Sequence, residues 1–320
     1  MRIGIDAMGG DYAPLECIKG ALRVRRELDT NVELVLFGDQ PLLHKICIEQ
    51  GGDGNEFTVV HSPEVIGMAE SPTKALLQKQ QSSIAIGFHF LKEKKIDAFA
   101  GAGNTGAMLV GAMYSVKTVE GVIRPAISTI LPHTDDHLGF LLDIGANSDC
   151  KPEVLLQFGI LGSLYAQHIY KVENPKVALL SIGEEEGKGN LLIKDTYPLM
   201  QDCSKINFIG NVEGRDIFGD KADVIVCDGF TGNIVLKFGE SFYDMIKKRN
   251  MSDPFWDRFN YENYGGTGIL GANAPIVIAH GISNATAFHN MILLAKSMVE
   301  SRIIEIFKEA FINHQNGHPN

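Results

Sequence analysis

Six short apolar runs constrain the fold of this chain most, because each ends in a loop of glycine and small polar residues. Such runs, closed by glycine, are typical of strands buried on both faces of a parallel sheet. Ligands of these sheets bind beyond the carboxyl ends of the strands, where backbone N–H groups and helix N-termini attract anions. Six such loops favour a phosphate-handling enzyme over a scaffold. The segments are IGIDAMGGD (3–11), AFAGAGNTGA (98–107), FLLDIGANSD (140–149), LLSIGEEEGKGN (179–190), VIVCDGFTGN (224–233) and VIAHGISNAT (277–286).

Composition limits the classes of protein to which the chain can belong. Its 320 residues are 45% apolar and 21% charged, as expected for a globular protein with a large core. The net charge of −10 argues against general nucleic-acid binding, which needs a basic face. The five cysteines show no zinc-ligand spacing. No apolar stretch reaches the roughly 18 residues of a membrane span, and Met1 leads straight into a strand, so we expect a cytoplasmic protein.

Basic residues nevertheless gather at three places. Clusters of this kind are most often solvated helix ends, and we expect at most one of them to face an acidic partner. We favour the third, because it precedes an aromatic segment. The clusters are Arg23, Arg25 and Arg26; Lys92, Lys94 and Lys95; and Lys247, Lys248 and Arg249.

Strand and helix alternate along the chain, which predicts a three-layer α/β/α protein with a mostly parallel sheet. Strands at 126–132 and 138–143 are expected to form a hairpin, so the sheet should be mixed at one edge. We expect residues 1–320 to form a single unit, with a division into two sublobes as the alternative. Long helices are predicted over 71–95 and 285–312.

One glycine-rich loop favours a different class of enzyme. Gly101-x-Gly103-x-x-Gly106 matches the dinucleotide-binding fingerprint between a strand and a helix. That fingerprint normally forms the first strand-to-helix turn, and an acidic residue ends the next strand about 20 positions later. Here at least two strands precede the loop, and Glu120 lies just after the helix instead. The match is weak, and a nicotinamide-dependent oxidoreductase is kept as an alternative.

A second loop presents a lysine. The segment GEEEGKGN (183–190) is similar to a phosphate loop, but it is one residue short and has no Ser or Thr after Lys188. Lys188 is suited to hold a phosphate or carboxylate, although an exposed loop lysine is an equal alternative. There is no G-x-S-x-G motif, and His133 and His137 flank two aspartates in an expected hairpin turn, which gives little support for a metal site. The lack of a nucleophile motif and of clear metal ligands favours chemistry in which the substrate itself supplies the nucleophile.

Polar loop motifs follow one another in order along the whole chain: Asp6-Ala-Met-Gly-Gly-Asp11 with Pro14, Ser71-Pro72-x-Lys74-Ala75, Gly101-x-Gly103-Asn104-Thr105-Gly106-Ala107, Arg124-Pro125, Leu142-Asp143-x-Gly145-Ala146-Asn147, Gly183-Glu-Glu with Lys188-Gly-Asn190, Phe208-x-Gly210-Asn211-x-Glu213-Gly214, Asp228-Gly229-Phe230-x-Gly232-Asn233 and Ala279-His280-Gly281. Taken together, these loops resemble those of one enzyme family, the bacterial PlsX-type phosphate acyltransferases of phospholipid synthesis. That family is similar in fold to isocitrate and isopropylmalate dehydrogenases and to phosphate acetyltransferases, which accounts for the dehydrogenase-like loop without NAD.

The resemblance implies a homodimeric enzyme that transfers a fatty acyl group from acyl carrier protein to inorganic phosphate without a cofactor or metal. Phosphate attacks a thioester directly, so the protein must hold a dianion and stabilise an oxyanion. We expect Lys188 to hold the phosphate or the developing charge and Asn233 to donate to the thioester oxygen. His280 is a candidate to protonate the departing thiolate, although a thiolate leaves readily without an acid. The expected phosphate-binding residues, for which loop capping is the equal alternative, are Asp6, Gly9, Gly10, Asp11, Asn104, Thr105, Asn147, Asn190, Asn211, Asp228 and Thr231.

Two points stay open after this resemblance. Residues 245–264 are shorter and more acidic than the segment that the family uses at the membrane surface, so a weak peripheral membrane contact is left open. The stretch 250–274, which holds the only tryptophan, is expected to be an irregular or mobile loop. A non-catalytic scaffold that binds acyl carrier protein is the alternative from outside the enzymes.

Overall fold

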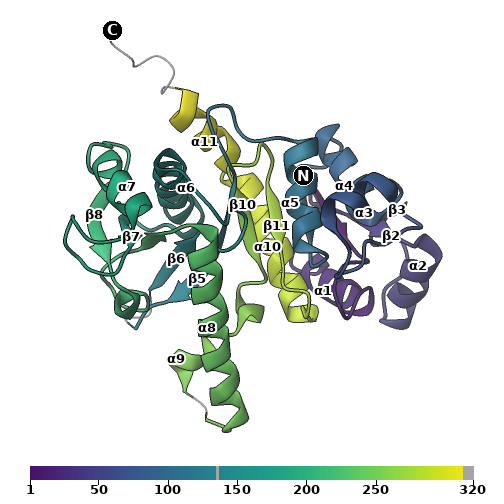
Figure 1. Cartoon of the computed structure of the whole chain (residues 1–320). Helices are drawn as coiled ribbons and strands as arrows, with labels where there is room; N and C mark the ends of the chain where they lie inside the picture. The colour runs from purple at the N-terminus through teal and green to yellow at the C-terminus, as the bar shows by residue number, and fades with distance from the viewer. Residues whose placement is uncertain (135–136, 252, 313–320) are drawn as a thin grey trace. The chain divides into compact units, whose positions relative to one another are not determined.

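The chain divides into two compact α/β units (Figure 1). The computed structural model describes residues 1–134, 137–251 and 253–312. The first unit comprises Met1–Lys117 and Tyr261–Ile304; the second comprises Thr118–Asn260 and, of the described residues, those from Glu305 to Ile312. Each unit has a mostly parallel sheet with one antiparallel pair at its edge, so the predicted α/β class with a partly mixed sheet is confirmed.

The first unit is built on a sheet with the strand order β3-β2-β1-β4-β11-β10. Neighbouring strands are parallel except β10 and β11. Helix α1 packs against α10, and α4 packs against α5. The elements are β1 (Arg2–Asp6), α1 (Leu15–Arg25), β2 (Glu33–Gly38), α2 (Gln40–Glu49), β3 (Thr58–His61), α3 (Pro72–Gln78), α4 (Ser83–Lys92), β4 (Ala98–Gly101), α5 (Thr105–Ser115), a 3₁₀ turn at Tyr261–Asn263, β10 (Thr267–Leu270), β11 (Ile276–Ile278), α10 (Ala285–Glu300) and the start of α11 (Ile303–Ile312).

Aromatic rings fill the space between this sheet and α4. The Phe99 ring meets Phe37 edge-on at 5.8 Å and Phe88 at 5.0 Å between centroids. All three side chains are buried, and edge-to-face pairs of this kind stabilise a core beyond the area that they bury. The packed core fixes β1 and β4 side by side, so the loops that follow them begin at neighbouring points.

The second unit is built on a sheet with the order β5-β6-β9-β7-β8, in which β5 is antiparallel to β6 and the other neighbours are parallel. The predicted hairpin of 126–132 and 138–143 is therefore confirmed as a strand pair. The elements are β5 (Ala126–Pro132), β6 (Leu138–Leu142), α6 (Pro152–Tyr170), β7 (Lys176–Leu180), α7 (Leu191–Gln201), β8 (Asn207–Val212), a 3₁₀ turn at Gly214–Asp216, β9 (Val224–Val226), α8 (Gly229–Lys248) and α9 (Pro254–Asp257).

Two of the predicted long helices are each broken in two. The helix predicted over 71–95 ends at Gln78, and α4 begins anew because the Ser82 side chain accepts a hydrogen bond from Ala85 N and caps the new helix. The helix predicted over 285–312 is interrupted at Arg302, which adopts a left-handed backbone conformation with φ 54°. Of the stretch 250–274, the structure describes α9, a 3₁₀ turn and β10.

Among the described residues, no helix combines the length and the apolar character that crossing a membrane requires.

Candidate active site

In the first unit, four loops meet at the carboxyl ends of β1, β4 and β11. Asp11 N donates to Gly281 O at 2.7 Å, which ties the loop after β1 to the loop after β11. A Cβ on Gly10 would stand 3.2 Å from Gly281 O, and Gly10 has a φ of +109°, so only glycine suits this close approach. The double-glycine loop is therefore held against its neighbours by its backbone.

Asp6 is the buried centre of this loop cluster. Its Oδ1 accepts from Met8 N at 3.1 Å, whereas Oδ2 lies between Gly9 and Gly103 without a hydrogen bond of regular geometry. Burial raises the pKa of Asp6, and nearby donors, led by the Ser83 side chain, counteract part of the rise. A side chain on Gly9 would collide with Oδ2, and one on Gly103 would stand 2.8 Å from it. The Asp6 carboxylate thus packs directly against both glycine loops, the one after β1 and the one after β4.

Both the oxygen and the nitrogen of the Asn104 side-chain amide form hydrogen bonds. Its Oδ1 accepts from Ala107 N at 3.0 Å and caps α5, while Nδ2 donates to the carbonyls of Gly67, Met68 and Glu70. This arrangement corresponds to the loop-capping alternative, because no N–H of the amide is left for a phosphate. Thr105, the first residue of α5, is exposed at the same edge.

The fingerprint glycines of this loop have packing reasons of their own. A side chain on Gly101 would stand 2.8 Å from the Asp6 Cβ, and one on Gly106 would collide with the Pro72 ring. Each glycine therefore permits close contact within the first unit, whatever the ligand. The motif does not by itself indicate a dinucleotide.

His280 follows β11 and is exposed. Its ring lies against Tyr261, with centroids 5.2 Å apart and planes tilted by 36°. The Tyr261 hydroxyl donates to Ile282 O at 2.9 Å, which fixes this loop next to the imidazole. The sequence analysis did not single out Tyr261, because its sequence position, 19 residues before His280, shows nothing of the contact.

In the second unit, Asp143 organises the loop after β6. Its Oδ1 accepts from Ile127 N, Gly145 N and Ala146 N at 3.1–3.3 Å, and its Oδ2 accepts from Asn147 N at 2.6 Å and Asn147 Nδ2 at 2.9 Å. Burial raises the pKa of Asp143, and these donors oppose the rise. Sequence reasoning placed Asp143 in a motif but not among the site residues. The signal was available, because Asp6 is the last residue of one buried strand, Asp143 directly follows another, and both precede a glycine loop.

Asn147 connects this loop to the start of α8. Its side chain donates to Pro125 O at 2.8 Å, and its backbone oxygen accepts from Gly229 N at 2.7 Å. Asp228 caps α8 by accepting from Thr231 N and from the Thr231 hydroxyl at 2.8 and 2.9 Å. Asp228 and Thr231 are thus joined directly, and Asn147 is connected to the same helix start through Gly229.

Asn233 lies in the first turns of α8 and is exposed. One N–H of its amide donates to Ile144 O at 3.1 Å. Because an asparagine amide carries two N–H donors, a second donor remains for a ligand. The bond to Ile144 orients the side chain over the loop that Asp143 organises.

Lys188 is exposed in the loop between β7 and α7, where its stem covers Gly183. Asn190 caps α7 by accepting from Ile193 N at 2.9 Å, and Asn211 Nδ2 donates to Glu185 O at 3.0 Å. Both asparagines order the loop that carries Lys188. The Lys188 ammonium makes no ion pair or hydrogen bond within the described part of the chain, so its charge is available to a ligand.

Neither a reactive thiol nor a metal cluster is found near these loops in the described residues. Burial raises the pKa of Cys150 to about 12 and the pKa of Cys227 well above its ordinary value, so neither thiol is an activated nucleophile. No group of three or more His, Cys, Asp or Glu within residues 1–134, 137–251 and 253–312 has the arrangement of a metal site. Of the turn that His133 and His137 flank, residues 135 and 136 lie outside the described residues.

The second unit therefore offers an ordered glycine loop, a lysine without a carboxylate partner and an amide with a spare N–H, and the first unit offers ordered glycine loops and an exposed histidine. Comparison with solved structures places the fold in the same class as a phosphotransacetylase of Streptococcus pyogenes. The two share 16% sequence identity, the match covers 95% of this chain and 94% of that chain, and the TM-score is 0.67.

Comparison of sequences then gives the family. The chain is 41% identical over 323 residues to a phosphate acyltransferase of Dictyoglomus turgidum, covering 95% of each, and 43% identical over 333 residues to a phosphate acyltransferase of Desulforamulus reducens, covering 98% of each. Residues 1–255 match the family model described as fatty acid synthesis protein. The chain belongs to the phosphate acyltransferase family, the family that its loops resemble.

Proposed function

We propose that this enzyme transfers a fatty acyl group from acyl carrier protein to inorganic phosphate, giving an acyl phosphate for phospholipid synthesis. The observation that carries the proposal is the identity of 41–43% to phosphate acyltransferases over nearly the whole chain. The chemistry of the described loops agrees with it. A charge that is free to meet a dianion and an N–H that is free to meet an oxyanion are the two elements that direct attack by phosphate needs.

The proposed reaction has one addition and one elimination. A phosphate oxygen attacks the thioester carbonyl carbon, a C–O bond forms, and the carbonyl electrons move onto oxygen. The C–S bond then breaks, the carbonyl re-forms, and the carrier leaves as a thiolate that takes up a proton. Phosphate supplies the nucleophile and the thioester supplies the activated acyl group, so the scheme uses no cofactor.

In the second unit, we assign Lys188 to the phosphate charge and Asn233 to the thioester oxygen. Lys188 is a point charge at the tip of a loop that Asn190 and Asn211 order. Asn233 is held by Ile144 O, is exposed, and keeps a second N–H for a ligand. Asn147, Asp228 and Thr231 support this pair through the hydrogen bonds that connect the loop after β6 to α8.

In the first unit, we assign phosphate binding to the loops that Asp6 organises. Gly9, Gly10, Asp11 and Thr105 belong to these loops, and Asn104 anchors one of them. The His280 imidazole, which lies against Tyr261, is assigned to the proton that the departing thiolate takes up. An exposed histidine next to a fixed tyrosine suits such a transfer.

The test follows release of the free carrier thiol from acyl-acyl carrier protein. Release should require inorganic phosphate and should be indifferent to NAD. Phosphate should also raise the melting temperature of the protein by binding to the folded state, and NAD should not. Stabilisation by NAD without a response to phosphate would contradict the proposal and support an oxidoreductase, and carrier binding without thiol release would support a scaffold.

We further propose that the enzyme is a homodimer paired through α8. Beyond Gly229 and Gly232, none of the 20 residues of α8 is buried, and the helix extends past the strands of its own unit (Figure 1). Its exposed large apolar side chains follow one another at steps of three or four residues, a stripe that fits a second helix. They are Phe230, Ile234, Phe238, Phe242 and Met245, with 41–63% of each side chain exposed.

A second copy is the occupant that this stripe fits best, because the same stripe on a partner helix makes a self-complementary contact. The double variant Phe238→Glu, Phe242→Glu should be monomeric by light scattering, whereas Leu77→Glu, a matched change at an apolar residue of α3 that is 69% exposed, should stay dimeric. A monomeric parent whose α8 variant no longer binds anionic vesicles would assign the stripe to a membrane surface instead. We place the dimer in the cytoplasm, where phosphate and acyl carrier protein are dissolved.

A further inference from the structure

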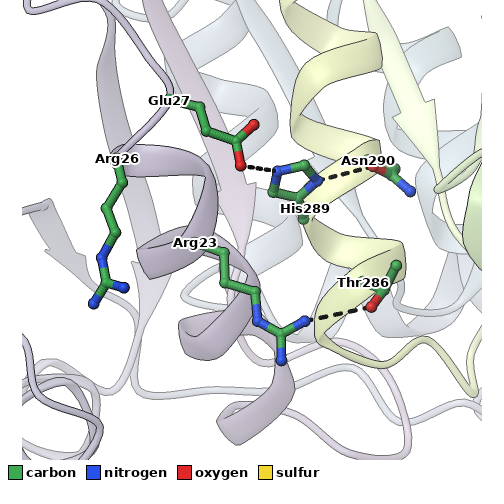
Figure 2. Close-up of a pocket in the computed structure, with 6 residues that line it drawn as sticks. All are labelled: Arg23, Arg26, Glu27, Thr286, His289 and Asn290. Carbon is green, nitrogen blue, oxygen red and sulfur yellow. Dashed lines mark hydrogen bonds and ion pairs between the residues drawn. The ribbon is translucent and has the colours of Figure 1, made fainter.

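An open pocket of about 440 Å³ lies between α1 and α10 in the first unit. Figure 2 shows Arg23 reaching across to Thr286, with the guanidinium 3.4 Å from the hydroxyl oxygen, and Arg26 extending away from α10. The residues that line it are Arg23, Arg26, Glu27, Thr286, His289 and Asn290.

The pocket rests on a rigid helix crossing. A Cβ on Gly20 of α1 would stand 2.6 Å from the Phe288 Cβ and 2.7 Å from Ala285 O of α10. The Glu16 carboxylate accepts from Ala285 N at 2.8 Å and ties the start of α10 to α1. The two helices therefore hold the lining residues in fixed relative positions, as a recognition site requires.

Two exposed arginines line this pocket. Within the described part of the chain, neither Arg23 nor Arg26 forms an ion pair with a carboxylate, and both are exposed. Arg25 differs, because its guanidinium donates to Val32 O at 2.7 Å and is committed to the fold. Arg23 donates to the Thr286 hydroxyl and interacts electrostatically with Glu16, but both guanidinium groups stay exposed, and on a chain of net charge −10 they form a locally basic place that attracts acidic groups.

Glu27, the acidic residue of the pocket, is directed elsewhere. Its Oε1 lies 3.0 Å from His289 Nε2, and the other ring nitrogen of His289 lies 2.8 Å from Asn290 Oδ1. Figure 2 shows this chain of contacts on the α10 side, while Arg26 points the opposite way. Glu27 is thus paired with the histidine and leaves the arginines to a partner.

The other two basic clusters show fewer features of a binding site for an acidic partner. Lys247 lies over the Tyr243 ring at 5.2 Å, at the exposed end of α8. Lys95 lies over the Phe90 ring at 5.3 Å, and Lys92 and Lys94 stand at the end of α4. Each of these clusters fits a solvated helix end, where cations are favoured by the helix dipole.

We infer that the pocket between α1 and α10 is the docking site for the acidic face of the acyl carrier protein, with Arg23 and Arg26 as its charge anchors. This inference rests on the proposed function. Arginine is suited to this role, because its planar guanidinium binds carboxylates through two parallel hydrogen bonds. Thr286 and His289 lie in the first two turns of α10, a helix that begins directly after the loop carrying His280. A carrier docked there delivers its thioester arm toward the loops of the first unit.

The experiment compares charge reversal in all three basic clusters. The variants are Arg23→Glu with Arg26→Glu, Lys92→Glu with Lys94→Glu, and Lys248→Glu with Arg249→Glu. Binding of acyl carrier protein is measured for each by surface plasmon resonance at two salt concentrations. The first variant should weaken binding about tenfold or more and lose most of the salt dependence, because like charges now face each other. The other two should bind like the parent.

Turnover gives a second readout. For the Arg23, Arg26 variant, kcat/KM with acyl-acyl carrier protein should fall about tenfold relative to kcat/KM with acyl-N-acetylcysteamine, a thioester without a protein carrier. Parental binding by this variant, or a loss that falls instead on the Lys248, Arg249 variant, would overturn the docking site. A parent that binds the carrier through these arginines but releases no thiol with phosphate would leave the docking site in place and refute the proposed function.

Discussion

Replacing Asp143 by asparagine should destabilise the second unit. An asparagine keeps one oxygen, which can serve the three N–H donors that face Oδ1, from Ile127, Gly145 and Ala146. Its Nδ2 then faces Asn147 N and Asn147 Nδ2, two donors that lose their acceptor. In the opposite orientation of the amide, three N–H donors would lose their acceptor instead of two. The first orientation therefore loses fewer hydrogen bonds.

The magnitude follows from these two contacts. Hydrogen bonds to a charged group are worth roughly 1.5–3 kcal/mol each, so two of them amount to about 3–6 kcal/mol. Relief of the buried charge offsets part of this loss, because burial raises the pKa of Asp143. We therefore expect the free energy of unfolding to fall by about 3 kcal/mol.

Urea unfolding followed by tryptophan fluorescence checks this expectation. The single tryptophan, Trp256, belongs to the second unit, so its emission reports on that unit. Asp149→Asn is the matched control, because Asp149 is exposed in the same loop. The reasoning is refuted if Asp143→Asn and Asp149→Asn unfold at the same urea concentration as the parent.

Three further changes test other parts of the account. Gly20→Ala should lower the free energy of unfolding by about 1–3 kcal/mol in urea titrations, because the new methyl group overlaps α10. Gly187→Ala should leave the free energy of unfolding unchanged, because a Cβ at Gly187 meets no atom within 4 Å. Asp6→Asn should gain stability relative to the parent as pH rises above the ordinary carboxyl pKa of 3.8. Burial raises the pKa of Asp6, so its stabilising contribution exists at low pH and is lost as pH rises through the folded-state pKa. Lys188→Ala should lower kcat/KM about 10- to 100-fold and Asn233→Ala should lower kcat by about 100-fold, with melting curves like those of the parent; near-parental turnover of either variant would remove it from the site.

The strands and the loops that follow them were predictable, because apolar runs closed by glycine are typical of the buried strands of a parallel sheet. The break between α3 and α4 was not predictable from the sequence. The helical pattern continues through Ser82, and the pattern alone does not show whether the chain forms one long helix or ends the first and begins a second at the Ser82 cap. Strand β10 was missed for another reason. It is four residues long, and its pairing with β11 forms only in the folded unit.

The site was predictable in its residue types and less so in its contacts. Asn190 and Asp228 cap helices, the local alternative that their positions before α7 and α8 suggested. The bonds from Asn104 to the carbonyls of residues 67–70 join segments 34–37 positions apart, and no local pattern shows them. The same holds for the pocket between α1 and α10, where Arg23 and Thr286 lie 263 positions apart.

Detection of the acyl phosphate itself tests the central claim most directly. The enzyme is incubated with acyl-acyl carrier protein and inorganic phosphate, and the products are followed by ³¹P NMR, with hydroxylamine trapping as a second readout. The account predicts a new acyl phosphate resonance that grows in step with free carrier thiol and is absent when phosphate is omitted. Release of the thiol with free fatty acid as the product, at a rate independent of phosphate, would contradict it.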